Sequence, residues 1–205
     1  MITAQIVLYA GVGFTAGLIS GIFGIGGGSV RIPLLNILGM PLISAFAVNM
    51  FVIPFAQSVG AYTHRINIDK NIALPAVIGG VLGSIAGAIF TGLVSTLILS
   101  IIFVTVAFLT IVGVYLDRIS PKLYQRLTPS WKNVALGTFV LNLITGMRGG
   151  SGGSLFPPFL KAMHLDIHKA IATSLFITMF TASGAIIIYW GRGNIPWLSA
   201  LSVLI

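Results

Sequence analysis

Two glycine-rich segments are the parts of this sequence best suited to bind a small anion. The first runs from Gly24 to Ser29 and is followed by Arg31, and the second runs from Arg148 to Ser154. Runs of glycine break a helix, because glycine adopts backbone angles that other residues avoid and adds no side-chain packing. Backbone amides at such a break, together with a guanidinium group, are suited to hold anionic oxygens.

We therefore expect the substrate-binding residues to come from both segments. They are Gly26, Gly27, Gly28, Ser29, Arg31, Arg148, Ser151, Gly152, Gly153 and Ser154. Four polar residues of the flanking helices are further candidates for the lining of the site: Asn49, Gln57, Asn142 and Ser174. We also expect Ser29 and Ser154 to cap the helices that follow, so that the positive ends of the helix dipoles face the site.

The charged residues narrow the class of ligand. The sequence contains no glutamate, and Asp69, Asp117 and Asp166 lie in expected loops or at segment ends. Arg31 and Arg148, by contrast, lie in apolar surroundings, where a charged side chain is costly and usually functional. The sequence also lacks cysteine, which excludes thiolate metal sites. We expect no catalytic residue, no metal site and no cofactor.

Two other interpretations of the glycines stay open. Glycines let membrane helices pack closely, and we assign Gly83 and Gly87 to packing alone. The stretch Gly149–Gly152 has the Gly-x-Ser-Gly pattern of an intramembrane serine protease, with Ser151 as nucleophile and a histidine as base. Gly26 occupies the position equivalent to Ser151 in the first segment. The repeated feature is therefore a backbone shape, and we do not expect an enzyme.

The composition predicts a membrane protein. Apolar residues make up 57% of the 205 residues and charged residues only 7%, whereas a soluble domain carries about 25% charged residues. A soluble enzyme is excluded, because its surface needs more charge. We attribute the net charge of +8 to basic cytoplasmic loops, and we expect no nucleic acid partner.

Apolar stretches long enough to cross a bilayer, which takes about 20 residues, occur along the whole chain. The expected segments are Ala4–Ile22, Leu42–Tyr62, Ile72–Leu93, Thr96–Leu116 and Ala170–Tyr189, with shorter stretches at Trp131–Met147 and Ile195–Ile205. The sequence therefore predicts an all-α polytopic membrane protein with about seven transmembrane segments. We treat residues 1–205 as a single transmembrane domain whose first helix is retained rather than cleaved as a signal.

The sequence repeats itself at an offset of 125 residues. About a third of the positions between Ala10 and Ser58 are identical to those 125 residues later, roughly three times what composition alone gives. The repeated halves span about residues 4–93 and 131–205, and each contains a glycine-broken helix and a short helix of re-entrant type. Internal repeats are common in secondary transporters, whose sites lie near the bilayer midplane where the halves meet.

Basic residues predict the orientation of the chain. Arg65–Asn71 and Asp117–Asn133 are expected loops on one side, and their six basic residues place that side in the cytoplasm. If each glycine segment forms a hairpin, Lys161 and Lys169 join them, and Arg192 alone among the loop residues lies outside. The two halves then have opposite orientations, which is the arrangement we expect. A single broken crossing at each segment would instead make the halves parallel.

The two glycine segments resemble those of the sulfite exporter TauE/SafE family. The resemblance is closest at Gly24–Gly28, followed by Pro33 and by Gly39–Pro41, and it extends over nearly the whole chain. In the second copy Ser151 stands where a glycine is usual. The resemblance implies a secondary transporter of the prokaryotic plasma membrane that moves sulfite, sulfonates or related organosulfur anions without ATP hydrolysis. An anion-selective channel has the same local features and stays open as an alternative.

The expected partners follow from this interpretation. They are the small anion and the lipid bilayer, and further copies of the chain in a homo-oligomer are an open alternative.

Overall fold

The computed structural model describes residues 2–23, 27–95, 97–98, 101–102, 104–105, 108–109, 112 and 115–204. This part of the chain is built from helices, and no strand occurs in it. The helices are α1 (Ile2–Phe23), α2 (Gly28–Ile37), α3 (Leu42–Thr63), η1 (Arg65–Asn67), α4 (Lys70–Phe90), α6 (Leu116–Ile119), α7 (Pro121–Arg126), α8 (Trp131–Gly146), α9 (Phe156–Ala162), α10 (Ile167–Gly191) and α11 (Trp197–Leu204).

Long apolar helices dominate the fold. Helices α3, α4 and α10 are each long and apolar enough to cross a membrane. For every expected segment but one, the ends of the observed helix lie within three residues of the predicted ends; α4, for example, covers Lys70–Phe90 where the sequence predicts Ile72–Leu93. About half of the remaining segment, Thr96–Leu116, lies outside the described residues, so its ends are not compared.

Glycines allow α4 and α8 to pack at close range. A Cβ atom at Gly79, Gly83 or Gly87 would collide with the backbone of α8. Gly83 faces the carbonyl group of Phe139 and Gly87 faces that of Leu143, so the two helices run in the same direction. The assignment of Gly83 and Gly87 to helix packing is confirmed.

The second short helix, α9, turns back along α8. Gly137 of α8 faces the aromatic ring of Phe159 in α9. Beyond the end of α9, Nε2 of His164 lies 3.1 Å from the carbonyl oxygen of Tyr124 in α7. Because α7 directly precedes α8, the end of α9 lies beside the start of α8. Helices α8 and α9 therefore form a hairpin that begins and ends on the same side of the bundle. In the first half, α1 and α2 also contact each other.

Two hydrogen-bonded contacts define the directions of the long helices. The backbone N–H of Asp69 donates to Oγ1 of Thr173 at 3.0 Å, which places the turn between α3 and α4 beside the start of α10. At the other end, the guanidinium group of Arg192 donates to the carbonyl oxygens of Ala88 and Ile89. Helices α4 and α10 are therefore parallel, and α3 runs opposite to α10.

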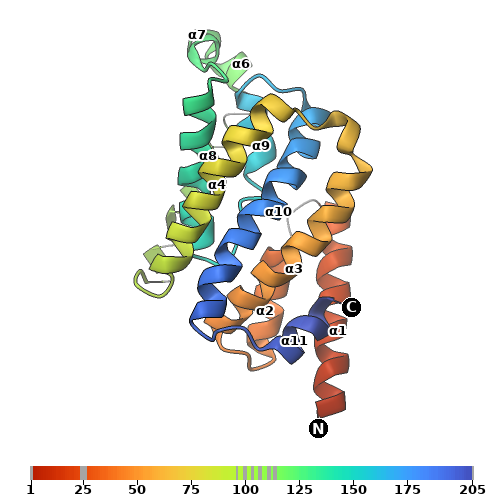
Figure 1. The fold of residues 1–205 in the computed structure, drawn as a ribbon. Helices are drawn as coiled ribbons and strands as arrows, with labels where there is room; N and C mark the ends of the chain where they lie inside the picture. The colour runs from red at the N-terminus through yellow and green to blue at the C-terminus, as the bar shows by residue number, and fades with distance from the viewer. Residues whose placement is uncertain are drawn as a thin grey trace.

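Basic residues gather at one end of the helix bundle, which we call the basic end. Figure 1 shows α6 and α7 at this end, with α11 and the N-terminus toward the other. The residues at the basic end are Arg65, Lys70, Arg118, Lys122, Arg126, Lys132, Lys161 and Lys169. Arg192 lies at the opposite end, beside the last turn of α4.

Several helices of the two halves correspond at the offset of 125 residues. Helix α3 begins at Leu42 and α10 begins at Ile167, which is 125 residues later. Gly39 and His164, also 125 residues apart, both have positive φ, at 89° and 68°. The offset relates α1 to α8, α3 to α10 and α4 to α11. The contacts between helices follow the same relation: α4 packs on α8 and α10, and α11 packs on α1 and α3. Exchanging the halves leaves these neighbours unchanged.

Candidate functional site

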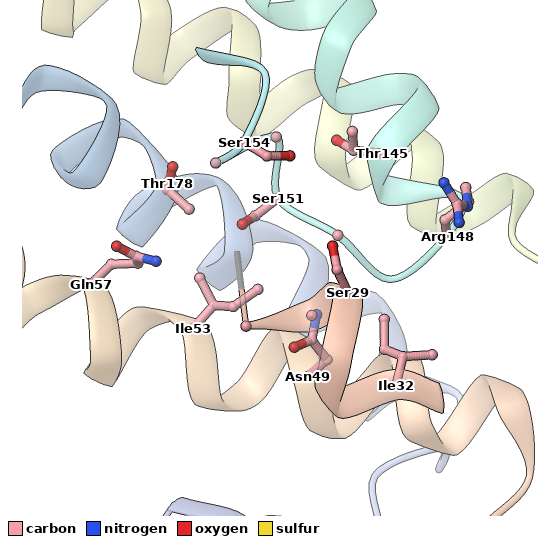
Figure 2. A pocket seen from close by; sticks show the side chains of 15 residues that line it. Ser29, Ile32, Asn49, Ile53, Gln57, Thr145, Arg148, Ser151, Ser154 and Thr178 are labelled. Carbon is pink, nitrogen blue, oxygen red and sulfur yellow. The ribbon is translucent and has the colours of Figure 1, made fainter. Parts of the chain in front are cut away.

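A cavity of about 200 Å³ lies where the two glycine segments meet. Figure 2 shows Ser29, Asn49 and Ser151 around the middle of this cavity, with Gln57 toward one end and Arg148 toward the other. The lining residues are Gly27, Gly28, Ser29, Ile32, Asn49, Ile53, Gln57, Thr145, Arg148, Gly150, Ser151, Gly152, Gly153, Ser154 and Thr178. We call it the central cavity, because both halves of the chain contribute to its walls.

The structure brings most of the predicted site residues together. Of the predicted binding residues, those that line the central cavity are Gly27, Gly28, Ser29, Arg148, Ser151, Gly152, Gly153 and Ser154. Among the predicted polar lining residues, Asn49 and Gln57 also line it. Gly26 lies outside the described residues. The other three predicted residues, Arg31, Asn142 and Ser174, do not line the cavity.

The second glycine segment forms a loop between two helices, as predicted. Helix α8 ends at Gly146, and α9 does not begin until Phe156. Within the loop, Gly149 and Gly152 have φ angles of 67° and 72°, which glycine adopts far more readily than other residues. The loop turns the backbone of residues 150–154 toward the central cavity.

Ser29 does not cap the first short helix, so that prediction is wrong. Helix α2 begins at Gly28 with Gly27 as its N-cap, and it has no side-chain cap. The amides of Val30 and Arg31 both donate to the carbonyl oxygen of Gly27, so the helix starts before the serine. Ser29 therefore belongs to the first helical turn, from which it reaches the cavity.

Ser154 does not cap the second short helix either, and that prediction is also wrong. Helix α9 begins at Phe156, with Leu155 in the N-cap position. Pro157 and Pro158 follow directly, because proline suits the first turn of a helix, where no amide donor is needed. Ser154 thus remains in the loop, as part of the cavity wall.

Arg31 is buried behind the central cavity. Its side chain is 4% exposed, and Nη1 donates a hydrogen bond of 2.7 Å to Oδ1 of Asn49. Nδ2 of Asn49 donates in turn to the carbonyl oxygen of Gly149, at 2.6 Å. A Cβ atom at Gly27 would lie 3.1 Å from Nη2 of Arg31, so the guanidinium group packs against the backbone of the cavity wall. This chain of bonds ties α2 and α3 to the glycine loop of the other half.

Asn142 and Ser174 bond to their own helices. Nδ2 of Asn142 donates to the carbonyl oxygen of Thr138 at 3.2 Å, and Oγ of Ser174 donates to that of Ile171 at 2.7 Å. Both acceptors lie about one turn earlier in the same helix. Asparagine and serine side chains often bond to the backbone of their own helix in this way, although Oδ1 of Asn142 is buried without a described hydrogen-bond partner. Sequence alone does not reveal which of these side chains face a cavity.

Sequence reasoning missed five residues of the cavity wall. These are Ile32, Ile53, Thr145, Gly150 and Thr178. Thr178 carried a usable signal, because it is a polar residue one helical turn after Ser174 in a largely apolar segment. Ile32 and Ile53 carry no polar group, so only the packing of α2 and α3 identifies them.

The central cavity has a positive electrostatic character. Arg148 is the charged residue among the described residues that line it, and Arg31 lies directly behind the wall. The carboxylates of Asp69 and Asp166 accept hydrogen bonds from the first amides of α4 and α10, at the basic end. The described residues of the cavity wall include no acidic side chain, so the wall presents polar groups and the positive charge of Arg148.

Apolar helices of membrane-spanning length around a polar interior cavity place the chain among helical membrane transporters. The profile of the family described as sulfite exporter TauE/SafE matches residues 9–205, and the chain belongs to this family. A protein of Methanocaldococcus jannaschii, named as a probable membrane transporter protein, is 26% identical over 192 residues, which cover 87% of this chain and 70% of the relative. No solved structure matches the chain.

Proposed function

We propose that the chain is a secondary transporter of small anions, with sulfite, sulfonates or related organosulfur anions as substrates. Membership of the sulfite exporter TauE/SafE family supports this substrate class. The observation that carries the proposal is the central cavity, in which Arg148 is the charged residue among those described. The described lining residues include an arginine and no carboxylate, so an anion is favoured over a cation.

Donors from both halves hold the anion in this proposal. The first turn of α2 presents the backbone of Gly27, Gly28 and Ser29, and the positive end of this helix dipole favours an anion. The loop of residues 150–154 lies across the cavity with backbone and hydroxyl donors. A volume of about 200 Å³ corresponds to about six or seven waters at about 30 Å³ each. A small sulfonate therefore displaces most of the water from the cavity.

The cavity lies between equivalent positions of the two halves, which supports an inverted repeat with the site at its interface. Four pairs of lining residues are each 125 residues apart: Gly27 and Gly152, Gly28 and Gly153, Ser29 and Ser154, and Ile53 and Thr178. The opposite directions of α3 and α10 also support inversion. Transporters built in this way bind substrate near the bilayer midplane, between the repeats.

We place the protein in the prokaryotic plasma membrane as a multi-pass protein of about seven crossing segments. The basic end then faces the cytoplasm, since cytoplasmic loops carry an excess of lysine and arginine. The turn after α4 and residues around Arg192 face outward.

Reconstituted vesicles test the proposal. We expect saturable uptake of radiolabelled sulfite or a small sulfonate, no uptake of rubidium, and a large loss of anion uptake for Arg148→Gln. Lys122→Gln, in a basic-end helix remote from the cavity, is the matched control and keeps normal uptake. Comparing vesicles with and without a pH gradient identifies whether protons drive the transport. Equal uptake by both variants would contradict the proposed site.

The same preparation separates the alternative functions. Ser151 is 4% exposed and its carbonyl oxygen accepts a hydrogen bond from Thr181, while His164 lies at the basic end beside Tyr124. The distance between Ser151 and His164 argues against a serine–histidine pair, and Ser151→Ala is expected to keep most of the uptake. Loss of uptake together with loss of a detectable proteolytic activity would favour an enzyme. Single-channel currents in planar bilayers would favour a channel.

A further inference from the structure

A second cavity adjoins the central cavity on the side away from the basic end. Its volume is about 630 Å³. Four residues belong to the walls of both cavities: Gly28, Ser29, Ile32 and Arg148. The rest of its wall includes Thr91–Ser95, the turn after α4, and Leu42 at the start of α3. These elements lie at the opposite end from the α3–α4 turn, so the second cavity extends outward from the site. We call it the outer vestibule.

We infer that the outer vestibule is an anion-binding antechamber, in which Arg148 draws a small anion from the outer side toward the central cavity. Its place on a transport pathway rests on the proposed function. The attraction of anions into the vestibule is a separate property of the fold, and it can be measured without transport.

The charge distribution around the vestibule supports this inference. Arg148 is the charged residue among the described residues of its wall. Arg192 lies close by, where its guanidinium group donates to the carbonyl oxygens of Ala88 and Ile89 at 3.0 and 2.8 Å, just before Thr91. Described aspartate side chains lie at the basic end instead. Arg148 and Arg192 place positive charge at the vestibule, and the described residues of its wall include no carboxylate, so the local concentration of anions is raised.

The volumes of the two cavities suggest separate roles. At about 30 Å³ per water, the vestibule holds about 20 waters and the central cavity six or seven. A hydrated anion therefore fits the vestibule with its first water shell. The same anion must exchange most of that shell for protein donors when it enters the central cavity. Arg148 lines both spaces, so it remains in reach of the anion during this exchange.

Single-cysteine labelling in intact cells tests the inference directly. The sequence has no cysteine, so each introduced thiol is the only one in this sequence, and its labelling is read on the purified protein after the reaction. Ser95→Cys places a thiol in the vestibule wall, and Ser120→Cys, between α6 and α7 at the basic end, is the matched control. The probes are two membrane-impermeant methanethiosulfonates of similar size, one carrying a sulfonate group and one carrying a trimethylammonium group.

We expect Ser95→Cys to react from outside, and Ser120→Cys to react only after the cells are permeabilised. The rate for the anionic reagent relative to the cationic one, normalised to a simple thiol in the same buffer, is expected to exceed one. Adding Arg148→Gln is expected to lower this ratio about fivefold, the effect of one charge several ångströms away in a watery space. Adding Arg148→Lys restores most of it.

Two results would overturn the inference. One is failure of Ser95→Cys to react from outside while Ser120→Cys does react there. The other is a normalised ratio near one that Arg148→Gln leaves unchanged. Transport is scored separately: a high, Arg148-dependent ratio in a protein that moves no anion would refute the proposed function and leave the vestibule as an anion-binding site.

Discussion

The side-chain amide of Asn49 donates a hydrogen bond of 2.6 Å to the carbonyl oxygen of Gly149, a residue 100 positions further along the chain. Asn49 belongs to the first half and Gly149 to the glycine loop of the second. Arg31 holds the other end of the same side chain at 2.7 Å. The walls of the central cavity are therefore fixed to each other by one asparagine, whose two polar atoms are both used.

Replacing Asn49 by alanine is expected to destabilise the protein and weaken anion binding together. The change leaves the Gly149 carbonyl and the Arg31 guanidinium group without these partners, and each buried unsatisfied group costs about 1 to 3 kcal/mol. A lower melting temperature in detergent and a weaker sulfonate affinity are the measurements.

Asn49→Asp separates charge from packing at the same position. The carboxylate keeps the contact with Arg31 but neutralises its charge and loses the donor to Gly149. We expect a smaller drop in melting temperature than for Asn49→Ala, with an equal or larger loss of anion affinity. An aspartate variant that binds the anion as tightly as the natural protein would show that the charge of Arg31 has no role in binding.

Gly152→Ala is expected to disturb the loop that forms the cavity wall. Gly152 has a φ of 72°, and an added Cβ would lie 2.9 Å from the ring of Phe156. Left-handed backbone costs a non-glycine residue about 1 to 3 kcal/mol. Gly17→Ala, in α1 with nothing within 4 Å of its Cβ position, is the control, and alanine there is expected to be neutral or stabilising. Anion affinity and melting temperature should fall only for the first variant.

Gly83→Leu tests packing apart from binding. The leucine side chain would collide with the backbone of Phe139, so α4 and α8 could not pack at their present distance. We expect little folded protein after membrane insertion, as measured by size-exclusion chromatography in detergent. Gly11→Leu, at an exposed position of α1 with open space around its Cβ, should give a normal yield. A normal elution profile for Gly83→Leu would contradict the close packing of these helices.

Opposite orientations of the halves predict a specific labelling pattern. Lys161→Cys lies in the last turn of α9, which returns to the basic end, whereas Arg192→Cys lies at the opposite end. Impermeant maleimide is therefore expected to label Arg192→Cys in intact cells and Lys161→Cys only after permeabilisation. Labelling of Lys161→Cys from outside would refute the inverted arrangement.

Much of the fold was predictable because membrane crossing imposes a simple rule on sequence. A run of about 20 apolar residues can cross a bilayer only as a helix here, since its backbone groups must be satisfied internally. This is why the predicted Leu42–Tyr62 and the observed Leu42–Thr63 differ by one residue. The loop of the second glycine segment was predictable for a different reason, because a run of glycines disfavours a helix.

The details of the site were less predictable, because they depend on which face of a helix meets which neighbour. Arg31 looked like a ligand by charge and position, yet its guanidinium group packs behind Gly27 and bonds to Asn49. The prediction that Ser29 and Ser154 cap the short helices α2 and α9 was also wrong. Ser29 lies one residue inside its helix and Ser154 two residues before the next, since backbone bonds to Gly27 and the Pro157–Pro158 pair decide these starts.

The measurement that tests the central claim most directly is the affinity of a small sulfonate for the purified protein by isothermal titration calorimetry. We expect saturable binding that Arg148→Gln and Gly152→Val each weaken, by about 1 to 3 kcal/mol for the lost charge-assisted bond of Arg148, or about 5- to 150-fold. Gly17→Ala should bind as the natural protein does. Unchanged affinity in both the arginine and the glycine variants would contradict an anion site at the central cavity, and the glycine segments would then serve only helix packing.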